Sequence, residues 1–281
     1  MNGNLPKNFN LTDIIGHRTN ILQQPFSIFS LGDSAITIDL GNLIEEQLNR
    51  KALAIKSWLE GQALAGVRDI IVAYSTVSVF YDPDSMLVAL PASHSDGGIY
   101  NHMCQKLKDA WTFSGEGGPE PSSGAIIRIP VCYGQEYGPD LEALAQARGL
   151  TCEEVVRLHS AVTYRVYMIG FLPGFSYLGK VDARLASNRK QVPAPVPAGG
   201  VGIAGDQTGI YPLNSPGGWQ IIGRTPLKLF DPGVSPPVRL SIGDQVLFFP
   251  VSKDEFLARA SHAAIVPASM PFKIINDQHH I

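Results

Sequence analysis

The sequence predicts an α+β domain, an antiparallel sheet with helices on one face, followed by a second domain that is mostly β. Up to Trp111, short apolar runs are interleaved with stretches of helical periodicity. Beyond Val162, short β-rich runs alternate with turns rich in Gly and Pro. Between them, residues 114–124 (SGEGGPEPSSG) contain no large apolar side chain and cannot bury surface. We therefore predict domains at 1–113 and 125–281, joined by a linker at 114–124.

The first domain is predicted to be a ββαββα unit, which suits an antiparallel sheet covered on one face by helices. Apolar alternation predicts the strands, helical spacing of apolar residues predicts the helices, and Asn42 is the expected N-cap of the first helix. The predicted strands are Phe26–Leu31, Ala35–Leu40, Asp69–Ala73 and Thr76–Tyr81, and the predicted helices are Asn42–Glu60 and Ile99–Trp111. No catalytic pattern is found in this domain.

The second domain begins with a strand and two helices and then becomes β-rich. Thr151 and Glu154 have the spacing of a capping box, which predicts a helix start there. Many short strands with abundant turn residues favour a closed barrel or a sandwich. The predicted strands are Ala125–Cys132, Tyr164–Ile169, Gly218–Ile222, Lys228–Phe230, Val238–Leu240 and Gln245–Pro250, and the predicted helices are Asp140–Arg148 and Glu153–Ser160.

Composition narrows the classes of function. Of the 281 residues, 44% are hydrophobic and 17% charged, which is typical of a globular protein. A net charge of −3 gives no general attraction to nucleic acid or to an anionic membrane. No apolar run approaches the roughly 18–20 residues that span a bilayer, and the N-terminus lacks a signal-peptide layout. Three widely spaced cysteines disfavour a disulfide framework or a zinc site, so we expect a cytoplasmic protein with reduced thiols and no metal site of its own.

The segment from Gly170 to Asp231 is where we expect the chemistry. Glycines and prolines crowd it, yet large aromatic side chains are threaded between them, which a disordered linker rarely shows. Tyr177, Tyr211 and Trp219 combine apolar faces with polar groups. They would line a pocket, form an interface or fill the interior of the barrel, and the sequence does not choose among these.

Charged groups gather near the same segment. An Arg fork holds a carboxylate or phosphate with two hydrogen bonds, which makes Arg165, Arg189 and Arg224 candidate anion binders. The alternative for Arg224 is a salt bridge to Asp231. His159 could carry protons near neutral pH, or be a core or capping histidine.

The run Gly200–Gly205 matches the dinucleotide-binding pattern G-x-G-x-x-G. That pattern works only between a strand and a helix, and here prolines precede it and Asp206–Pro212 cannot form a long helix. We predict a turn instead, either purely structural or with exposed amides that hold an anion. No nucleotide-binding P-loop sequence is present.

Four motifs carry a family resemblance: RLHSAVTYRVY, GFLPGFSYLG, VGIAGDQTGIYP and SPGGWQIIGRTPLKLFDP. They resemble the family that includes the B subunit of bacterial 5-oxoprolinase, allophanate hydrolase subunit 1 and the sporulation kinase inhibitor KipI. The likeness spans roughly residues 26–250. It implies a cyclophilin-like β-barrel for the second domain.

The resemblance also implies a component of an ATP-dependent 5-oxoprolinase, which opens 5-oxo-L-proline to L-glutamate. Such a chain would act with homologues of the C and A subunits and be inactive alone. ATP with Mg²⁺ would bind at a site that a partner completes. We hypothesise that Arg224 and Arg165 hold an anionic group, that His159 or Asp206 handles protons, and that Gln207 and the amides of Gly202–Gly205 orient an oxygen. The residues expected to line the substrate are Phe171, Pro173, Gly174, Tyr177, Gly202, Gly205, Gln207, Tyr211 and Trp219.

Other functions compete with this one. A KipI-like inhibitor of a sensor histidine kinase would use the second domain for binding without catalysis, and an allophanate hydrolase component would act on a urea-derived substrate. A peptidyl-prolyl isomerase would need an arginine over the prolyl bond, which nothing identifies. The chain also departs from the family between Asp182 and Val201, where two Pro-Arg elements are usual. Arg189 stands in for one arginine, and Gly200 replaces a usual serine.

Overall fold

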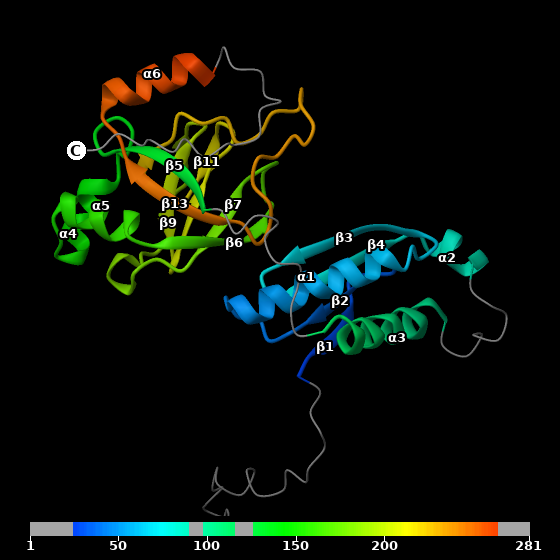
Figure 1. Ribbon diagram of the computed structural model, residues 1–281. Helices are drawn as coiled ribbons and strands as arrows, with labels where there is room; N and C mark the ends of the chain where they lie inside the picture. The colour runs from blue at the N-terminus through cyan, green and yellow to red at the C-terminus, as the bar shows by residue number, and fades with distance from the viewer. Residues whose placement is uncertain (1–24, 90–97, 116–125, 264–281) are drawn as a thin grey trace, which may run out of the picture.

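The computed structural model describes residues 25–89, 98–115 and 126–263. They form two lobes side by side, a sheet with helices and a barrel (Figure 1). The linker predicted at 114–124 lies outside the described residues, except for Ser114 and Gly115. Within these ranges no helix is long and apolar enough to cross a membrane.

The N-terminal lobe is a four-stranded antiparallel sheet with three helices. The strand order is β1-β2-β4-β3. Its elements are β1 Ser27–Ser30, β2 Ala35–Asp39, α1 Glu46–Gly61, β3 Val67–Ala73, β4 Thr76–Tyr81, α2 Pro83–Ala89 and α3 Gly98–Phe113. Strand alternation turns Val77 and Val79 into the same core as Ile55 and Leu107 from α1 and α3. Burying each of these side chains is worth about 1.5–3 kcal/mol.

The second lobe is a closed barrel of seven strands in the order β10-β7-β6-β13-β5-β12-β9. Only β13 and β5 pair in parallel. The barrel strands are β5 Ile126–Tyr133, β6 Thr163–Ile169, β7 Ser176–Gly179, β9 Gly200–Ala204, β10 Gln207–Ile210, β12 Gln220–Arg224 and β13 Gln245–Pro250. Around it lie α4 Leu141–Arg148, α5 Cys152–Ser160, the 3-10 helix η2 Ala183–Leu185, the pair β8 Ala194–Val196 and β11 Ser215–Gly217, and α6 Lys253–Ala263.

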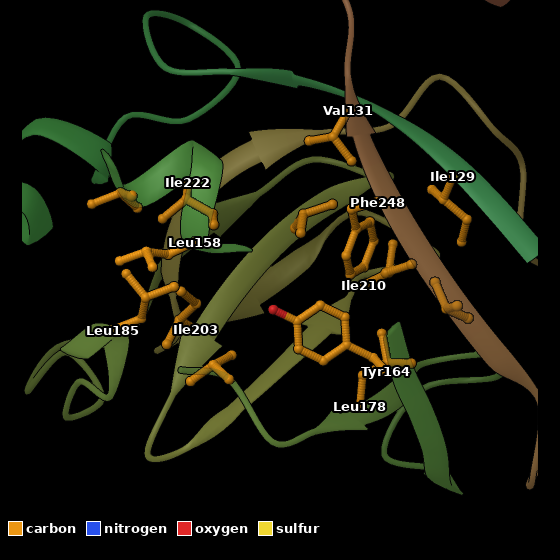
Figure 2. Close-up of a cluster of buried hydrophobic side chains, with 14 of the residues drawn as sticks. Ile129, Val131, Leu158, Tyr164, Leu178, Leu185, Ile203, Ile210, Ile222 and Phe248 are labelled. Carbon is orange, nitrogen blue, oxygen red and sulfur yellow. The ribbon is translucent and has the colours of Figure 1, made fainter. Parts of the chain in front are cut away.

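Inward-facing side chains fill the barrel. Figure 2 shows Tyr164 and Phe248 among aliphatic side chains such as Ile129, Leu178 and Ile203. All five are almost completely inaccessible to solvent. The barrel interior is therefore a packed core and not a channel.

The helices α4 and α5 begin and end where local chemistry places them. The predicted capping box is confirmed, because Thr151 accepts from the Glu154 amide and Glu154 accepts from the Thr151 amide. Gly149 ends α4 in the left-handed conformation, at φ 65°. Leu144, Val155 and Leu158 pack into the barrel core, so the pair covers part of the barrel wall.

Two predictions in the N-terminal lobe are wrong. The first helix begins at Glu46 with Glu45 as its N-cap, because Asn42 has φ 51° and its amide, with that of Gly41, donates to the Asp39 side chain. Helix α2 was not predicted, although Pro83 at its first position is a recognised start signal.

In the second lobe the prediction of a turn at Gly200–Gly205 is wrong. Residues Gly200–Ala204 form β9, a fully buried strand paired with β10 and β12, and only Gly205 and Asp206 turn. Glycine-rich sequence has low strand propensity, so pairing and packing override it. For the same reason β7, β8, β10 and β11 were missed, and α6 was missed as well. Predicted strands Lys228–Phe230 and Val238–Leu240 reduce to one bridge between Phe230 and Val238.

Candidate functional site

The aromatic residues of the Gly- and Pro-rich segment come together at one place. Phe175 lies at its centre, with ring centroids 4.7 Å from Tyr177, 4.8 Å from Tyr211 and 5.4 Å from Trp219. Phe171 adds an edge-to-face contact with Phe175 at 5.9 Å. We call these five residues the aromatic cluster.

Glycines permit this packing. A Cβ on Gly209 would approach the Trp219 ring to 2.9 Å, and one on Gly217 would collide with the Tyr211 hydroxyl. The predicted site residue Gly202 lies in the same layer, where a Cβ would stand 2.9 Å from Ile221 and 3.1 Å from Trp219. These glycines are thus explained by close packing against aromatic rings.

The turn that precedes Phe175 also has a clear local cause. The Phe175 amide donates to the Leu172 carbonyl at 2.9 Å, which closes a turn with Pro173 and Gly174 at its centre. Gly174 has φ 83°, as the third residue of a type II turn requires. Phe171, at φ 72°, is 67% exposed, so this turn presents an aromatic side chain to solvent.

One functional candidate was missed by sequence analysis, because it comes from the other lobe. Tyr74 lies at the β3–β4 turn, and its ring packs edge-on against Tyr177 at 6.1 Å. Its hydroxyl donates to Gln207 Oε1 at 3.2 Å. Burial raises the pKa of Tyr74 to about 12. No pattern around Tyr74 indicates this contact, since Gln207 lies 133 residues further along the chain.

Gln207 and Asp206 follow the β9–β10 turn. The Gln207 Nε2 atom is buried and has no hydrogen-bond partner among the described residues. Asp206 is exposed, and its carbonyl accepts from the Val181 amide at 2.8 Å. Gln207 therefore offers buried donors beside the aromatic cluster, and Asp206 remains a predicted proton handler.

Arg189 supplies a cation near the hydroxyls of Tyr177 and Tyr211. It is exposed and forms no ion pair or side-chain hydrogen bond within the described ranges. Burial raises the pKa values of Tyr177 and Tyr211, and the nearby Arg189 charge partly opposes this rise. Phe175, Tyr211 and Trp219 are buried in the packing of the cluster, so the groups that a ligand could meet are the exposed Phe171, the half-buried Tyr177 and the Arg189 guanidinium. A cation beside aromatic rings suits a small organic anion.

His159 lies elsewhere, so its predicted proton-handling role does not fit. It is completely buried in the barrel core and stacks on Phe248 at 4.7 Å. Nδ1 lies 2.8 Å from the Tyr133 hydroxyl and Nε2 lies 2.8 Å from Thr208 Oγ1. Because Thr208 donates its proton to the Gly202 carbonyl, Nε2–H must be the donor and Nδ1 the acceptor. Burial lowers the pKa of His159 to about 3, so the ring is a neutral core histidine.

The two predicted anion-binding arginines are also engaged elsewhere. Arg165 is buried between the lobes, where Nε donates to Asn49 Oδ1 at 2.9 Å and NH1 to the Gly243 carbonyl at 3.3 Å. Arg224 donates to the Ala198 carbonyl at 2.8 Å and lies over the Phe256 ring. The alternative salt bridge from Arg224 to Asp231 is not formed, since Asp231 pairs with Lys228. Arg165 lies on β6 and Arg224 on β12, and β13 and β5 separate these strands in the barrel.

The backbone amides predicted to cradle an oxygen are not free to hold a triphosphate. The amides predicted to cradle an oxygen belong to β9, which is paired on both sides, and the Gly205 amide donates to the Ser187 carbonyl at 2.7 Å. No group of three or more His, Cys, Asp or Glu side chains suited to a metal lies in the described part of the chain.

A cavity of about 770 Å³ lies between α5 and the β5–α4 connection, lined by Tyr133, Glu142, Val156 and Arg157 among others. It contains none of the predicted site residues.

Comparison with known proteins shows the family. The model of the carboxyltransferase domain, subdomains C and D, matches residues 26–240. The chain belongs to this family. The protein named as the B subunit of 5-oxoprolinase in Bacillus subtilis (strain 168) is 42% identical over 235 residues, 83% of this chain and 96% of its own length. The Haemophilus influenzae protein of the same name is 35% identical over 79% of this chain and 96% of its own length.

A solved structure agrees with the fold of this family member. The crystal structure of TTHA0988 matches with a TM-score of 0.63 and 33% identity over 80% of this chain. The match covers 40% of TTHA0988, so this chain corresponds to less than half of that protein.

Proposed function

We propose that this chain is the B subunit of an ATP-dependent 5-oxoprolinase, which opens 5-oxo-L-proline to L-glutamate. The observation that carries the proposal is the likeness to two proteins named as B subunits of 5-oxoprolinase, over 96% of the length of each. These names favour the enzyme over the kinase-inhibitor and allophanate hydrolase alternatives. A fold by itself would not separate them, because one fold supports many chemistries.

The chemistry explains why the chain would need partners. A lactam carbonyl is a poor electrophile, and phosphorylation of its oxygen by ATP creates a leaving group that lets water open the ring. That step requires a phosphate cradle and Mg²⁺. Since the β9 amides are engaged in strand pairing, we assign both groups to a site that homologues of the C and A subunits provide or complete. The chain alone would then be inactive.

We place the substrate at the aromatic cluster. The exposed Phe171 and the half-buried Tyr177 offer ring faces for the five-membered lactam, and Arg189 offers a fork for its carboxylate. Tyr211 and Trp219, predicted to line the substrate, are buried in the packing of the cluster and would support these rings. The residue sets proposed from sequence are thereby revised: Arg189 takes the anion-binding role first given to Arg165 and Arg224. Asp206 is the remaining candidate for proton handling.

Two finer features of the fold, and the cellular location, belong to the same proposal. Phe29, Ile71 and Phe80 are exposed while α1 and α3 share a core with the opposite side of the sheet, which supports helices on one face. The closed barrel supports a cyclophilin-like second domain. Three free cysteines support a reducing, cytoplasmic location.

The test is ATP hydrolysis that depends on 5-oxo-L-proline, measured for this chain alone and after reconstitution with its A and C homologues. Turnover is expected only in the full mixture. Components that co-purify without turnover would point to another amide or urea-derived substrate. Failure to associate at all would contradict the proposal and favour a regulatory role.

Replacing Arg189 by Gln tests the substrate position. We expect KM for 5-oxo-L-proline to rise about thirtyfold, the order expected when a charge-assisted hydrogen bond to a carboxylate is lost. The matched control is Arg184→Gln, which removes an exposed arginine that pairs with Asp182. A KM unchanged in Arg189→Gln, or raised equally in both variants, would place the substrate carboxylate elsewhere.

A further inference from the structure

Tyr74 adopts a backbone conformation that tyrosine rarely adopts. The pairing of Ala73 with Thr76 leaves Tyr74 and Ser75 as a two-residue turn, and Tyr74 has φ 57°. A left-handed conformation costs free energy for a residue with a Cβ, and it persists only when surrounding contacts enforce it. Phe171 of the aromatic cluster is also left-handed, so two such residues, one from each lobe, lie around the same cluster.

Contacts with Tyr167 across the lobe boundary, and with Asn49 of the same lobe, hold Tyr74 in place. Its amide donates to the Tyr167 carbonyl at 3.2 Å, and its own carbonyl accepts from Asn49 Nδ2 at 2.7 Å. Its ring stacks on Tyr167 at 6.4 Å with an interplanar angle of 18°. The backbone and ring are thus both fixed, and the hydroxyl is directed to one point in the barrel.

That point is the side-chain amide of Gln207. The Tyr74 hydroxyl donates to Gln207 Oε1 at 3.2 Å. The phenol stays protonated across the physiological range, since burial raises its pKa to about 12. With Oε1 engaged, the NH₂ group of Gln207 is turned to the other side, where Nε2 is buried and has no partner among the described residues.

A buried donor without an acceptor is unfavourable, and it is explained when a ligand supplies the acceptor. The aromatic cluster and Arg189 surround this region, since Tyr74 and Tyr177 are in ring contact and Arg189 acts on both hydroxyls. A cyclic amide with a carboxylate has the matching groups: a carbonyl oxygen for the amide donor and an anion for the guanidinium.

We propose that Tyr74 is a positioning residue which orients the Gln207 amide, so that Gln207 Nε2 donates to the carbonyl oxygen of a small cyclic amide. This inference rests on the proposed function for the identity of that amide, 5-oxo-L-proline. The N-terminal lobe then takes part in substrate recognition, because Tyr74, which orients the Gln207 amide, belongs to that lobe.

The decisive experiment is a double-mutant cycle in the reconstituted complex. Tyr74→Phe keeps the stacked ring and removes only the hydroxyl; Gln207→Met keeps the length of the side chain and removes the donors. Each single variant is expected to raise KM for 5-oxo-L-proline about tenfold with little change in kcat, the order of one hydrogen bond. In the Gln207→Met background, Tyr74→Phe is expected to add less than about twofold, because the two residues act as one unit.

The control is Tyr137→Phe, a buried tyrosine that packs on Phe256 away from the aromatic cluster, which should leave KM unchanged. An unchanged KM in Tyr74→Phe would overturn the inference, as would an undiminished effect in the Gln207→Met background. A parent complex without 5-oxoproline-dependent turnover would instead refute the proposed function.

A second measurement needs no turnover. In the isolated chain, the side-chain amide NMR signals of Gln207 are identified by their loss in Gln207→Met. They are expected to shift and broaden in Tyr74→Phe, since the amide is released to rotate. Signals identical to those of the parent chain would overturn the positioning role.

Discussion

Acidification from pH 6.5 to pH 4 is expected to cost this chain about 3 kcal/mol of unfolding free energy through His159 alone. The folded pKa of His159 is about 3, because the ring is completely buried. In the unfolded chain the imidazole takes up a proton near pH 6.5, its ordinary value. Stability is therefore fully present above pH 6.5 and falls steadily as the pH approaches the folded pKa.

The contacts of His159 make this cost specific. Both ring nitrogens are engaged in a fixed direction, from the Tyr133 hydroxyl to Nδ1 and from Nε2–H to Thr208. The Tyr133 hydroxyl donates its proton to Nδ1. A second proton on the ring, at Nδ1, would therefore point at the proton of that hydroxyl. Both hydrogen-bond partners of the ring are uncharged hydroxyls, so neither compensates the charge of an imidazolium.

The measurement is urea unfolding of the isolated chain at several pH values between 7 and 4, compared with His159→Phe. The variant is expected to start less stable at pH 7, because Tyr133 and Thr208 lose a partner. Its stability should then decline less with falling pH, by about 3 kcal/mol over this range, since other titrating groups are shared. Parallel pH dependences in the two chains would contradict a neutral, buried His159.

Replacing Asn49 by Leu is expected to destabilise the chain by about 3 kcal/mol, because the buried Arg165 guanidinium loses the acceptor of its Nε and two carbonyls lose a side-chain donor. Asn49 Oδ1 accepts from Arg165 Nε, and Nδ2 donates to the carbonyls of Tyr74 and Tyr167. Both Asn49 and Arg165 are buried where the lobes meet. Arg165 keeps its hydrogen bond to the Gly243 carbonyl, at 3.3 Å, and its contact with Glu46, at 3.6 Å, but neither replaces the acceptor that its Nε loses.

Urea unfolding also measures this effect, with Asn188→Leu as the control at an exposed position. The double variant Asn49→Leu with Arg165→Met should recover part of the loss, since the buried charge is then removed together with the acceptor of its Nε. If Asn49→Leu unfolds at the same urea concentration as the parent chain, the junction between the lobes is not held by this network.

The sequence predicted those parts of the fold that local chemistry decides. Strand β4 has the predicted bounds Thr76–Tyr81, because Val77, Val79 and Tyr81 recur at every second residue and face the core. The capping box at Thr151 is also local, because all its groups lie within four residues, and the sequence therefore predicted it. The family resemblance, carried by motifs of fixed spacing, agrees with the match over residues 26–240.

The candidate site was predicted only in part. The aromatic residues between Gly170 and Asp231 were expected to gather, and they do, because a Gly- and Pro-rich chain must return on itself many times. Charged residues were assigned by nearness in sequence, and here the assignment failed for His159, Arg165 and Arg224. A strand sends successive side chains to opposite faces, so nearness along the chain does not place two groups in one site.

Local patterns in the sequence thus predicted most helices and strands, the family and the segment that carries the aromatic cluster. The tertiary structure alone decided that a glycine-rich run is a buried strand, that His159 is a core residue and that Tyr74 meets Gln207. The physical reason is the same in each case. These outcomes depend on partners in other elements, whose positions are fixed by barrel closure and by docking of the lobes, and no local pattern encodes them.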